Sequence, residues 1–184
     1  MEGRIKLSGR LRGNYVVIED FDAAQEIYQN GFGTKEKKKL ILNSYEGLYL
    51  CSIDKVEVFN GKEILTFDRL MDILYNADKN ILSRFLVYRD LRSRGFVVKE
   101  GFGFRLDFRV YDKSDYGNKT AKYVVFVLNE GSNISLEKIF QDALDIKKMG
   151  KKSIMAAVDR RGEVIYYQIS EAFFSAKNQF GSIL

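Results

Sequence analysis

The chain contains no histidine, no proline and no tryptophan, and it has a single cysteine, Cys51. Without histidine, catalytic triads of the Ser-His-Asp or Cys-His kind are excluded. One cysteine cannot form an internal disulfide, and Cys51, within the apolar run LYLCSI, is expected to pack as a small hydrophobic side chain. With so few strong ligands, a transition-metal site is not expected. The sequence thus predicts neither a metal nor a cofactor.

Long apolar runs are missing as well. No apolar stretch approaches the roughly 18 residues of a membrane span, and the first residues, MEGRIKLSGR, lack the apolar segment of a signal peptide. We therefore expect a cytoplasmic protein without a membrane partner. There is also no GxxxxGK[ST] loop, and the GFG at 31–33 and the GFGF at 101–104 are too short for a dinucleotide-binding fingerprint.

Hydrophobic and charged residues are abundant, and the charge is uneven. The 184 residues are 46% hydrophobic and 14% aromatic, which is enough for the core of one ordinary domain or two small ones. The formal charge is +5, divided into −1 over residues 1–80 and +6 over residues 81–184. This asymmetry suggests a polyanion as partner of the second half, although a modest positive charge also serves solubility.

Residues 1–80, the N-terminal half, predict a small mixed α/β domain. Alternating and β-branched residues indicate strands on both sides of a turn at Gly13-Asn14. A short helix is predicted before Asn30-Gly31, a second around 45–50 with a strand on each side, and an amphipathic third at 65–77 with Thr66 as N-cap. The residues expected on buried faces are Phe21, Ala24, Ile27 and Tyr28 in the first helix and Phe67, Leu70, Leu74 and Tyr75 in the third.

Residues 81–184, the C-terminal half, predict one helix followed by a mostly β region. The helix ends near Gly95, and a second helix is expected between Ser135 and Gly150. The five strand-like runs cover 96–101, 104–111, 121–128, 153–159 and 164–170. The whole is of the α/β (α+β) class, with a mixed central sheet flanked by helices in the second domain and a domain boundary between 1–80 and 81–184.

The densest functional signal is a group of basic and aromatic residues between 84 and 111. Its cations are Arg89, Arg92, Arg94, Lys99, Arg105 and Arg109, interleaved with Phe96, Phe102, Phe104 and Phe108. Such a mixture is typical of a surface that binds a phosphate backbone and stacks bases. The same pattern also fits core aromatics with ordinary salt bridges to Asp90, Glu100 and Asp107.

The string YRDLRSRGFVVKEG at 88–101, followed by DFRVY at 107–111, resembles the signature of the archaeal tRNA-splicing endonuclease family, Y-x-D-L-R-x-R-G-[YF]-x-V-K-x-G and D-F-x-V-Y. EGLYL at 46–50 resembles the family's E-A-L-Y-L. KKSIMAAVDRRGEVIYY at 151–167 resembles its final segment, so the likeness covers about residues 31–168. It implies that the second domain is endonuclease-like. From the basic and aromatic pattern described above, Arg92, Arg94, Lys99, Arg105 and Arg109 are the residues predicted to bind RNA.

The resemblance implies a metal-free reaction. Members cut the bulge-helix-bulge of precursor tRNA and leave a 2′,3′-cyclic phosphate and a 5′-hydroxyl, with a Tyr, a His and a Lys as the catalytic triad. The Tyr falls on Tyr111 and the Lys on Lys151, but the His position is Thr120. A threonine hydroxyl does not titrate near neutrality and cannot act as the acid. Whether Lys119 or Lys122 replaces it is left open by the sequence.

Further departures from the family pattern point to a site without catalytic duty. The arginine expected seven residues before Lys151 is Leu144, and in the G-x-K-[YF]-G stretch Gly103 and Arg105 replace a lysine and a glycine. The turn VDRRGEV keeps Asp159 and Glu163 where members carry an acidic loop that docks into a partner subunit. A simple hairpin turn with solvated charges fits these residues too.

From this pattern we expect the structural, non-catalytic subunit of an archaeal heterotetrameric (α2β2) splicing endonuclease. Its partners would be a homologous catalytic subunit and precursor tRNA. Two alternatives remain at the level of sequence: an active homo-oligomeric endonuclease with an altered acid group, and an RNA-binding module that does not cleave. The tail at 171–184 lies past the resemblance, and its role does not follow from its residues.

Overall fold

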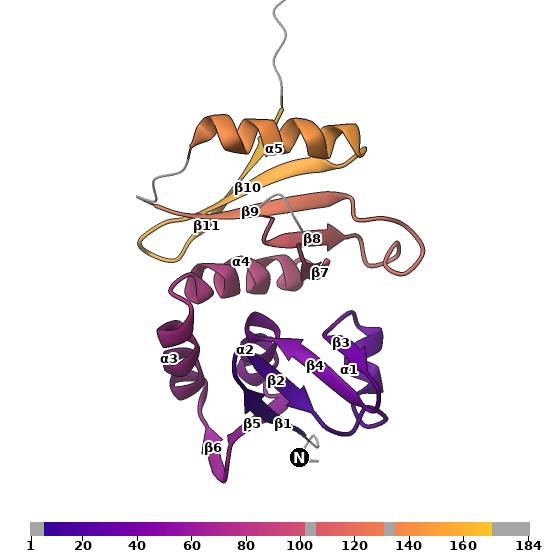
Figure 1. Cartoon of the computed structure of the whole chain (residues 1–184), viewed down its shortest axis with the longest axis vertical. Helices are drawn as coiled ribbons and strands as arrows, with labels where there is room; N and C mark the ends of the chain where they lie inside the picture. The colour runs from indigo at the N-terminus through magenta and orange to yellow at the C-terminus, as the bar shows by residue number, and fades with distance from the viewer. Residues whose placement is uncertain (1–5, 102–105, 131–134, 171–184) are drawn as a thin grey trace, which may run out of the picture.

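The computed structural model describes residues 6–101, 106–130 and 135–170. Two sheets, one in each half of the chain, lie at opposite ends of an elongated molecule, with helices between them and on the far side of the second sheet (Figure 1). The mixed α/β class predicted from the sequence is therefore confirmed. No helix among the described residues is long and apolar enough to cross a membrane.

The N-terminal half forms a six-stranded sheet with three helices. Its strand order is β3-β4-β2-β1-β5-β6, and every neighbouring pair is antiparallel except β1 and β5. The elements are β1 (Leu7–Arg12), β2 (Tyr15–Ile18), α1 (Gln25–Gln29), β3 (Thr34–Glu36), β4 (Lys39–Asn43), α2 (Ser44–Ser52), β5 (Val56–Asn60), β6 (Glu63–Leu65) and α3 (Phe67–Ala77).

Local chemistry explains several of these boundaries. Gly13 has a φ of +58° in the β1–β2 turn, a conformation that glycine adopts without a Cβ penalty. The hydroxyl of Thr66 accepts a 3.3 Å hydrogen bond from the Arg69 amide and caps α3, as predicted. At the start of α2, the Glu46 carboxylate accepts a 2.9 Å bond from the amide of Asn43, which closes a capping box.

The C-terminal half forms a five-stranded sheet in the order β11-β10-β9-β8-β7. The parallel pair β9 and β10 is connected through α5, a β-α-β unit, whereas the other neighbours are antiparallel. The elements are α4 (Ile81–Ser93), β7 (Val97–Glu100), β8 (Phe108–Tyr111), β9 (Tyr123–Asn129), α5 (Leu136–Lys148), β10 (Lys152–Val158) and β11 (Val164–Ile169).

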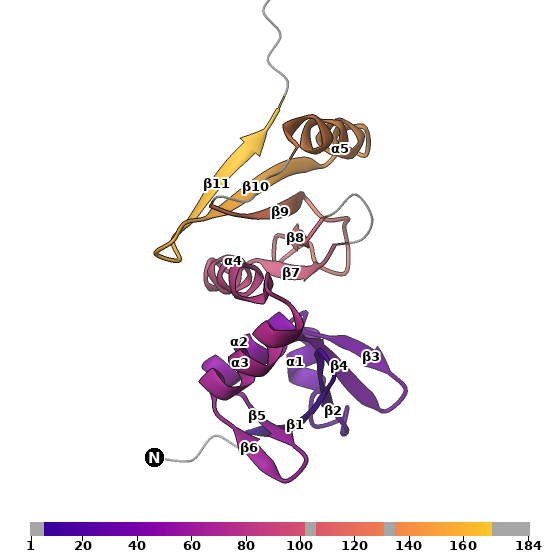
Figure 2. The same cartoon turned by 60° about the vertical axis from the view of Figure 1, so that its left-hand side comes forward.

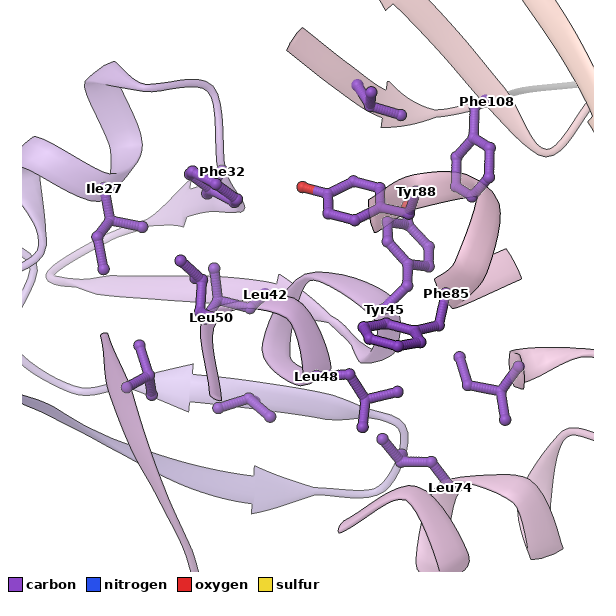
Figure 3. Packing of buried hydrophobic residues seen from close by; sticks show 14 of the residues in the cluster. Ile27, Phe32, Leu42, Tyr45, Leu48, Leu50, Leu74, Phe85, Tyr88 and Phe108 are labelled. Carbon is purple, nitrogen blue, oxygen red and sulfur yellow. The ribbon is translucent and has the colours of Figure 1, made fainter. Parts of the chain in front are cut away.

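Helix α4 lies between the two halves and joins their cores. The Tyr88 ring, on α4, lies 4.9 Å from the Tyr45 ring of α2 and 6.0 Å from the Phe108 ring of β8, centroid to centroid. Figure 3 shows these rings meeting beside Phe85. One continuous cluster of buried residues therefore runs from Val16 to Val158. A domain boundary between residues 80 and 81 stays a prediction, since α4 packs against both sides of it.

The structure corrects some details. Strands β3 and β6 were not predicted, and the run at 104–111 is a strand only from Phe108 onward within the described residues. Tyr28 and Tyr75, expected on buried faces, are 39% and 41% exposed. Each ring is covered only in part, Tyr28 by an edge-on contact with Phe21 and Tyr75 by the ammonium of Lys79.

Candidate functional site

Three residues of the predicted active-site region lie side by side at the same edge of the C-terminal sheet, each at one end of a neighbouring strand. Tyr111 closes β8, and the amide of Lys122 donates a 3.0 Å bond to the carbonyl of the preceding residue, Val110. The amide of Lys152 donates a 3.2 Å bond to the Lys122 carbonyl, so Lys151 is the next position along the row. Strands are about 4.8 Å apart, which puts the backbones of Tyr111 and Lys151 roughly 10 Å from each other.

Tyr111 and Lys151 lie on the α5 side of the sheet. Residues alternate along a strand, and Val110 packs into the core on the α4 side, so Tyr111 faces the α5 side. Lys151 lines a pocket together with residues of α5. The Lys122 ammonium instead lies 5.2 Å from the centroid of the Tyr123 ring, which packs into the core on the α4 side. The two triad remnants are therefore at one end of one face.

The Tyr111 side chain is held from two directions. Arg109 donates a 3.1 Å hydrogen bond from Nη1 to the Tyr111 hydroxyl, and its Nε donates a 2.9 Å bond to the Glu100 carbonyl. The ring of Tyr116, from the β8–β9 connection, meets the Tyr111 ring edge-on at 5.4 Å. Burial raises the pKa of the Tyr116 hydroxyl. Tyr111 is therefore a positioned side chain on a supported strand end.

Lys151 and Leu144 line the same pocket between α5, β10 and β11. Position 144, where the resemblance implies an arginine, therefore lies in the pocket of Lys151. Leucine presents only apolar atoms there, so it can neither stack as a guanidinium nor bind phosphate. The complete lining is Ala143, Leu144, Lys147, Lys151, Lys152, Ser153, Gln168, Ile169 and Ser170.

Thr120, at the histidine position, is exposed in the β8–β9 connection. The two lysines near it are both ion-paired. Lys119 lies 2.9 Å from Asp115, and Lys122 lies 2.8 Å from Asp112. The hydrogen bond from Lys122 to Asp112 raises the pKa of the Lys122 ammonium above its ordinary value. An ammonium held in this way is a weaker proton donor at neutral pH than an isolated lysine.

Lys99, predicted to bind RNA, is directed into the protein. Its ammonium donates to the carbonyls of Gly31 and Gly33 at 3.2 and 2.6 Å and lies 4.0 Å from the carboxylate of Glu46. Glu46 is buried and also accepts a 2.9 Å bond from the Gly33 amide. Burial raises the pKa of the Glu46 carboxyl and lowers that of the Lys99 ammonium, and each charge opposes the shift of the other.

The arginines of the basic group also make internal contacts. The Arg92 guanidinium stacks 3.8 Å above the Phe32 ring and donates to the carbonyls of Asn30 and Phe96. Arg94 pairs with Asp90 at 2.7 Å, and the Tyr166 hydroxyl donates to the same carboxylate. Phe108 is fully buried, and Phe96 packs on Tyr123.

The described members of the group thus fit the second sequence interpretation, in which aromatics form core and cations form internal bonds. Arg105, Phe102 and Phe104 lie outside the described residues. That Arg92, Arg94, Lys99 and Arg109 also bind RNA stays a prediction. The pairing of Lys99 with Glu46 was missed at the sequence level. A charged residue within the apolar helix SYEGLYL was the signal that could have indicated it.

The predicted docking turn between β10 and β11 is closed by Asp159. Its Oδ1 accepts hydrogen bonds from the amides of Arg161 and Glu163, at 2.8 and 2.9 Å. Arg160 binds the Glu130 carboxylate through its amide, at 3.2 Å. The Asp159 carboxylate therefore shapes the turn, whereas Glu163 is exposed at its end. A docking role for Asp159 and Glu163 stays a prediction. Within the described residues, no three Cys, Asp or Glu side chains are grouped to hold a metal ion.

Comparisons with known proteins cover both halves of the chain. The family model described as tRNA intron endonuclease, catalytic C-terminal domain, matches residues 81–166, and the one described as tRNA intron endonuclease, N-terminal domain, matches residues 7–71. The tRNA-splicing endonuclease of Methanococcus vannielii is 32% identical over 164 residues, 89% of this chain and 93% of that protein. That of Thermococcus gammatolerans is 35% identical over 160 residues, 86% and 94% of the two chains.

Proposed function

Because this chain belongs to the tRNA intron endonuclease family, we propose that it is a subunit of a tRNA-splicing endonuclease that cuts precursor tRNA at bulge-helix-bulge junctions. Its relatives in Methanococcus and Thermococcus are named tRNA-splicing endonucleases. The products would carry 2′,3′-cyclic phosphate and 5′-hydroxyl ends. Within this enzyme, the chain takes the structural, non-catalytic role.

The observation that carries this role is the composition of the row at the end of the C-terminal sheet. Cleavage through the ribose 2′-hydroxyl needs a proton acceptor, a cation for the phosphorane charge and an acid for the leaving 5′-oxygen. Tyr111 and Lys151 remain in the row, but the position of the family's histidine is Thr120, in the β8–β9 connection. Lys122, the titratable side chain between them in register, is paired with Asp112 and has a raised pKa.

Leu144 gives independent support, because it lies in the pocket of Lys151 where the family pattern expects an arginine. By the family pattern, an acid at position 120 and a base-stacking cation at position 144 are thus both replaced. Two such losses fit a site released from catalysis better than they fit a single exchanged acid.

The proposed partner is a homologous subunit with the complete triad, in an α2β2 assembly in the cytoplasm of an archaeon. The turn with Asp159 and Glu163 is the proposed docking element. Because Asp159 binds two amides of its own turn, Glu163 would contribute most of the charge directed at the partner.

The test uses the full chain, alone and together with the histidine-bearing homologue from the same genome. Alone, it should leave a bulge-helix-bulge RNA intact. Together, the two should co-purify as a heterotetramer that cleaves. Cleavage by the isolated chain, abolished by Tyr111→Phe or Lys151→Ala, would overturn the structural role. A monomer that binds RNA and recruits no homologue would instead indicate an RNA-binding module.

A further inference from the structure

One face of the N-terminal sheet is uncovered in the part of the chain that the structure describes. Val16, Leu40 and Val58 point to the opposite face, where they are buried in the common core. Figure 2 shows α2 and α3 above the strands and no element below them. The open face carries a row in which Ile41, Val17, Arg10 and Phe59 are successive partners across four strands.

Cations gather at one side of this face. The β3–β4 hairpin, residues 34–39, contains four lysines and one glutamate. Together with the end of β1 it forms a shallow groove lined by Arg12, Val17, Glu19, Glu36, Lys37, Lys39 and Ile41. Two carboxylates, Glu19 and Glu36, also line this groove, so the excess of positive charge comes mainly from the hairpin with its four lysines and one glutamate.

These cations differ in how far they interact within the protein. A hydrogen bond from Lys39 and the charges of Arg12 and Arg10 lower the pKa of the Glu19 carboxyl, whereas the side chains of Lys37 and Lys38 have no recorded contact with another described residue. Lys39 pairs with Glu19 at 2.6 Å, and Lys35 lies 4.2 Å above the Phe21 ring. By contrast, the structure records no ion pair of Arg10, Arg12, Lys37 or Lys38 with any other described residue. All four side chains are exposed. The basic group at 84–111 is the opposite case, since its described arginines and Lys99 bind carbonyls, carboxylates or rings of the protein.

The hairpin adjoins the flank that carries the Tyr111 site. It begins three residues after Gly31, and a Cβ atom added to Gly31 would lie 3.4 Å from the Tyr116 ring. Tyr116 in turn packs on Tyr111. In Figure 1, the β3–β4 hairpin and the β8–β9 connection project on the same side of the molecule, away from α3. A ligand bound along this side would contact both.

We propose that the β3–β4 hairpin, with Arg10 and Arg12, binds the phosphate backbone of a base-paired RNA arm. The inference deepens the proposed function and rests on it for the identity of the RNA. Exposed cations on an open face are complementary to phosphates, and the side chains of Lys37 and Lys38 have no recorded contact with another described residue. A single strand would need successive aromatic rings on which to stack its bases, and Tyr15, 49% exposed, is the one well-exposed ring of this sheet face among the described residues.

The test measures binding of the full chain to a labelled RNA duplex of about 12 base pairs without a bulge, between about 50 and 200 mM salt. The variant Arg12→Gln/Lys37→Asn/Lys38→Gln removes three charges. Asn is chosen because Lys37 has a φ of +55°, which Asn tolerates. We expect binding at least tenfold weaker at low salt. The slope of log K against log salt should fall by about 2 to 3, near one unit per lost phosphate contact.

The matched control Lys62→Gln/Arg69→Gln/Lys79→Gln removes three exposed charges from the β6–α3 side and should bind as the parent chain does. Equal losses in both variants, or no loss in the first, would overturn the proposal. So would tighter binding of a single strand of the same length. The outcome is separate from that of the proposed function, because an isolated chain that cleaves RNA would refute the structural role and leave this duplex affinity measurable.

Discussion

The ammonium of Lys99, on β7, lies 4.0 Å from the carboxylate of Glu46, on α2, and both bind Gly33, one through its carbonyl and the other through its amide. The two halves of the chain are therefore joined by a buried pair of opposite charges with its hydrogen bonds largely satisfied. Removing one member of such a pair destabilises the fold far more than removing both, because the single remaining charge then has no partner in the interior.

Replacing Glu46 with glutamine should lower the free energy of unfolding by about 3 kcal/mol, since Lys99 would lose the buried carboxylate beside it. Chemical denaturation of the full chain measures this difference. Glu63→Gln, at an exposed strand position, serves as the control and should change stability by less than about 0.5 kcal/mol. A Glu46→Gln protein as stable as the parent would show that the pair does not hold the two halves together.

Substituting Gly31 by alanine should be more harmful than the same change at Gly13. Both glycines have positive φ values, +83° and +58°, so both variants strain the backbone. At Gly31 the new Cβ would also clash with Val97, whereas nothing lies within 4 Å at Gly13. We expect Gly31→Ala to cost about 2 kcal/mol more than Gly13→Ala. Denaturation midpoints that agree for the two variants would contradict the close packing of the 30–33 turn against β7.

The contribution of Asp90 to stability should depend on pH. Burial alone would raise the pKa of this carboxyl, but hydrogen bonds from Arg94 and Tyr166 outweigh it and lower the pKa below its ordinary value. The folded state thus favours the ionised form. Its contribution is present above the ordinary pKa of about 3.9 and is lost as the pH falls through the lowered value.

Asp90→Asn should accordingly be less stable than the parent chain by about 1 kcal/mol at pH 7, and the difference should vanish toward pH 2–3. Urea denaturation across this range follows the effect. Asp72→Asn, at an exposed position on α3, provides the comparison. A constant difference at all pH values would mean that Asp90 acts through packing and not through its charge.

Cleavage should be recoverable in the isolated chain by Thr120→His together with Leu144→Arg. The change adds an imidazole acid and a stacking cation to a row that keeps Tyr111 and Lys151. Because the imidazole must be protonated to act as acid, the rate should fall as the pH rises above about 6.5. Single-turnover cleavage of a bulge-helix-bulge RNA tests this, with Thr120→Gln/Leu144→Arg as the inactive control. If neither the variant nor the control cleaves, residues other than positions 120 and 144 must also prevent catalysis in this chain.

Much of the secondary structure could be predicted because its boundaries depend on residues that are close together in the sequence. Thr66 caps α3, and Gly95 and Gly150 adopt positive φ values where helices α4 and α5 end. Strands β3 and β6 were missed because three residues such as TKE or EIL show no alternation of their own. They become strands only because β4 and β5 offer them a hydrogen-bonding edge.

At the site, the types of the residues could be read from the sequence, but the contacts that their side chains make could not. Tyr111, Thr120 and Lys151 were assigned by motif. The register places Tyr111 and Lys151 at neighbouring strand ends, whereas Thr120 lies in the β8–β9 connection. The pairing of Lys99 with Glu46 joins residues far apart in sequence, so no local pattern indicates it. For the same reason, a count of cations does not distinguish the basic group between 84 and 111, whose described arginines and Lys99 make internal contacts, from the exposed Lys37 and Lys38 of the β3–β4 hairpin.

The Tyr88 ring contacts Tyr45 on one side and Phe108 on the other, so we expect the two halves of the chain to unfold together. Unfolding of either half would expose an aromatic ring of the other half to water. Probes placed in the two halves should therefore report a single, coincident thermal transition. A protease cut between α3 and α4 would leave two fragments that each present an aromatic face to water, and neither would keep its fold for long without the other.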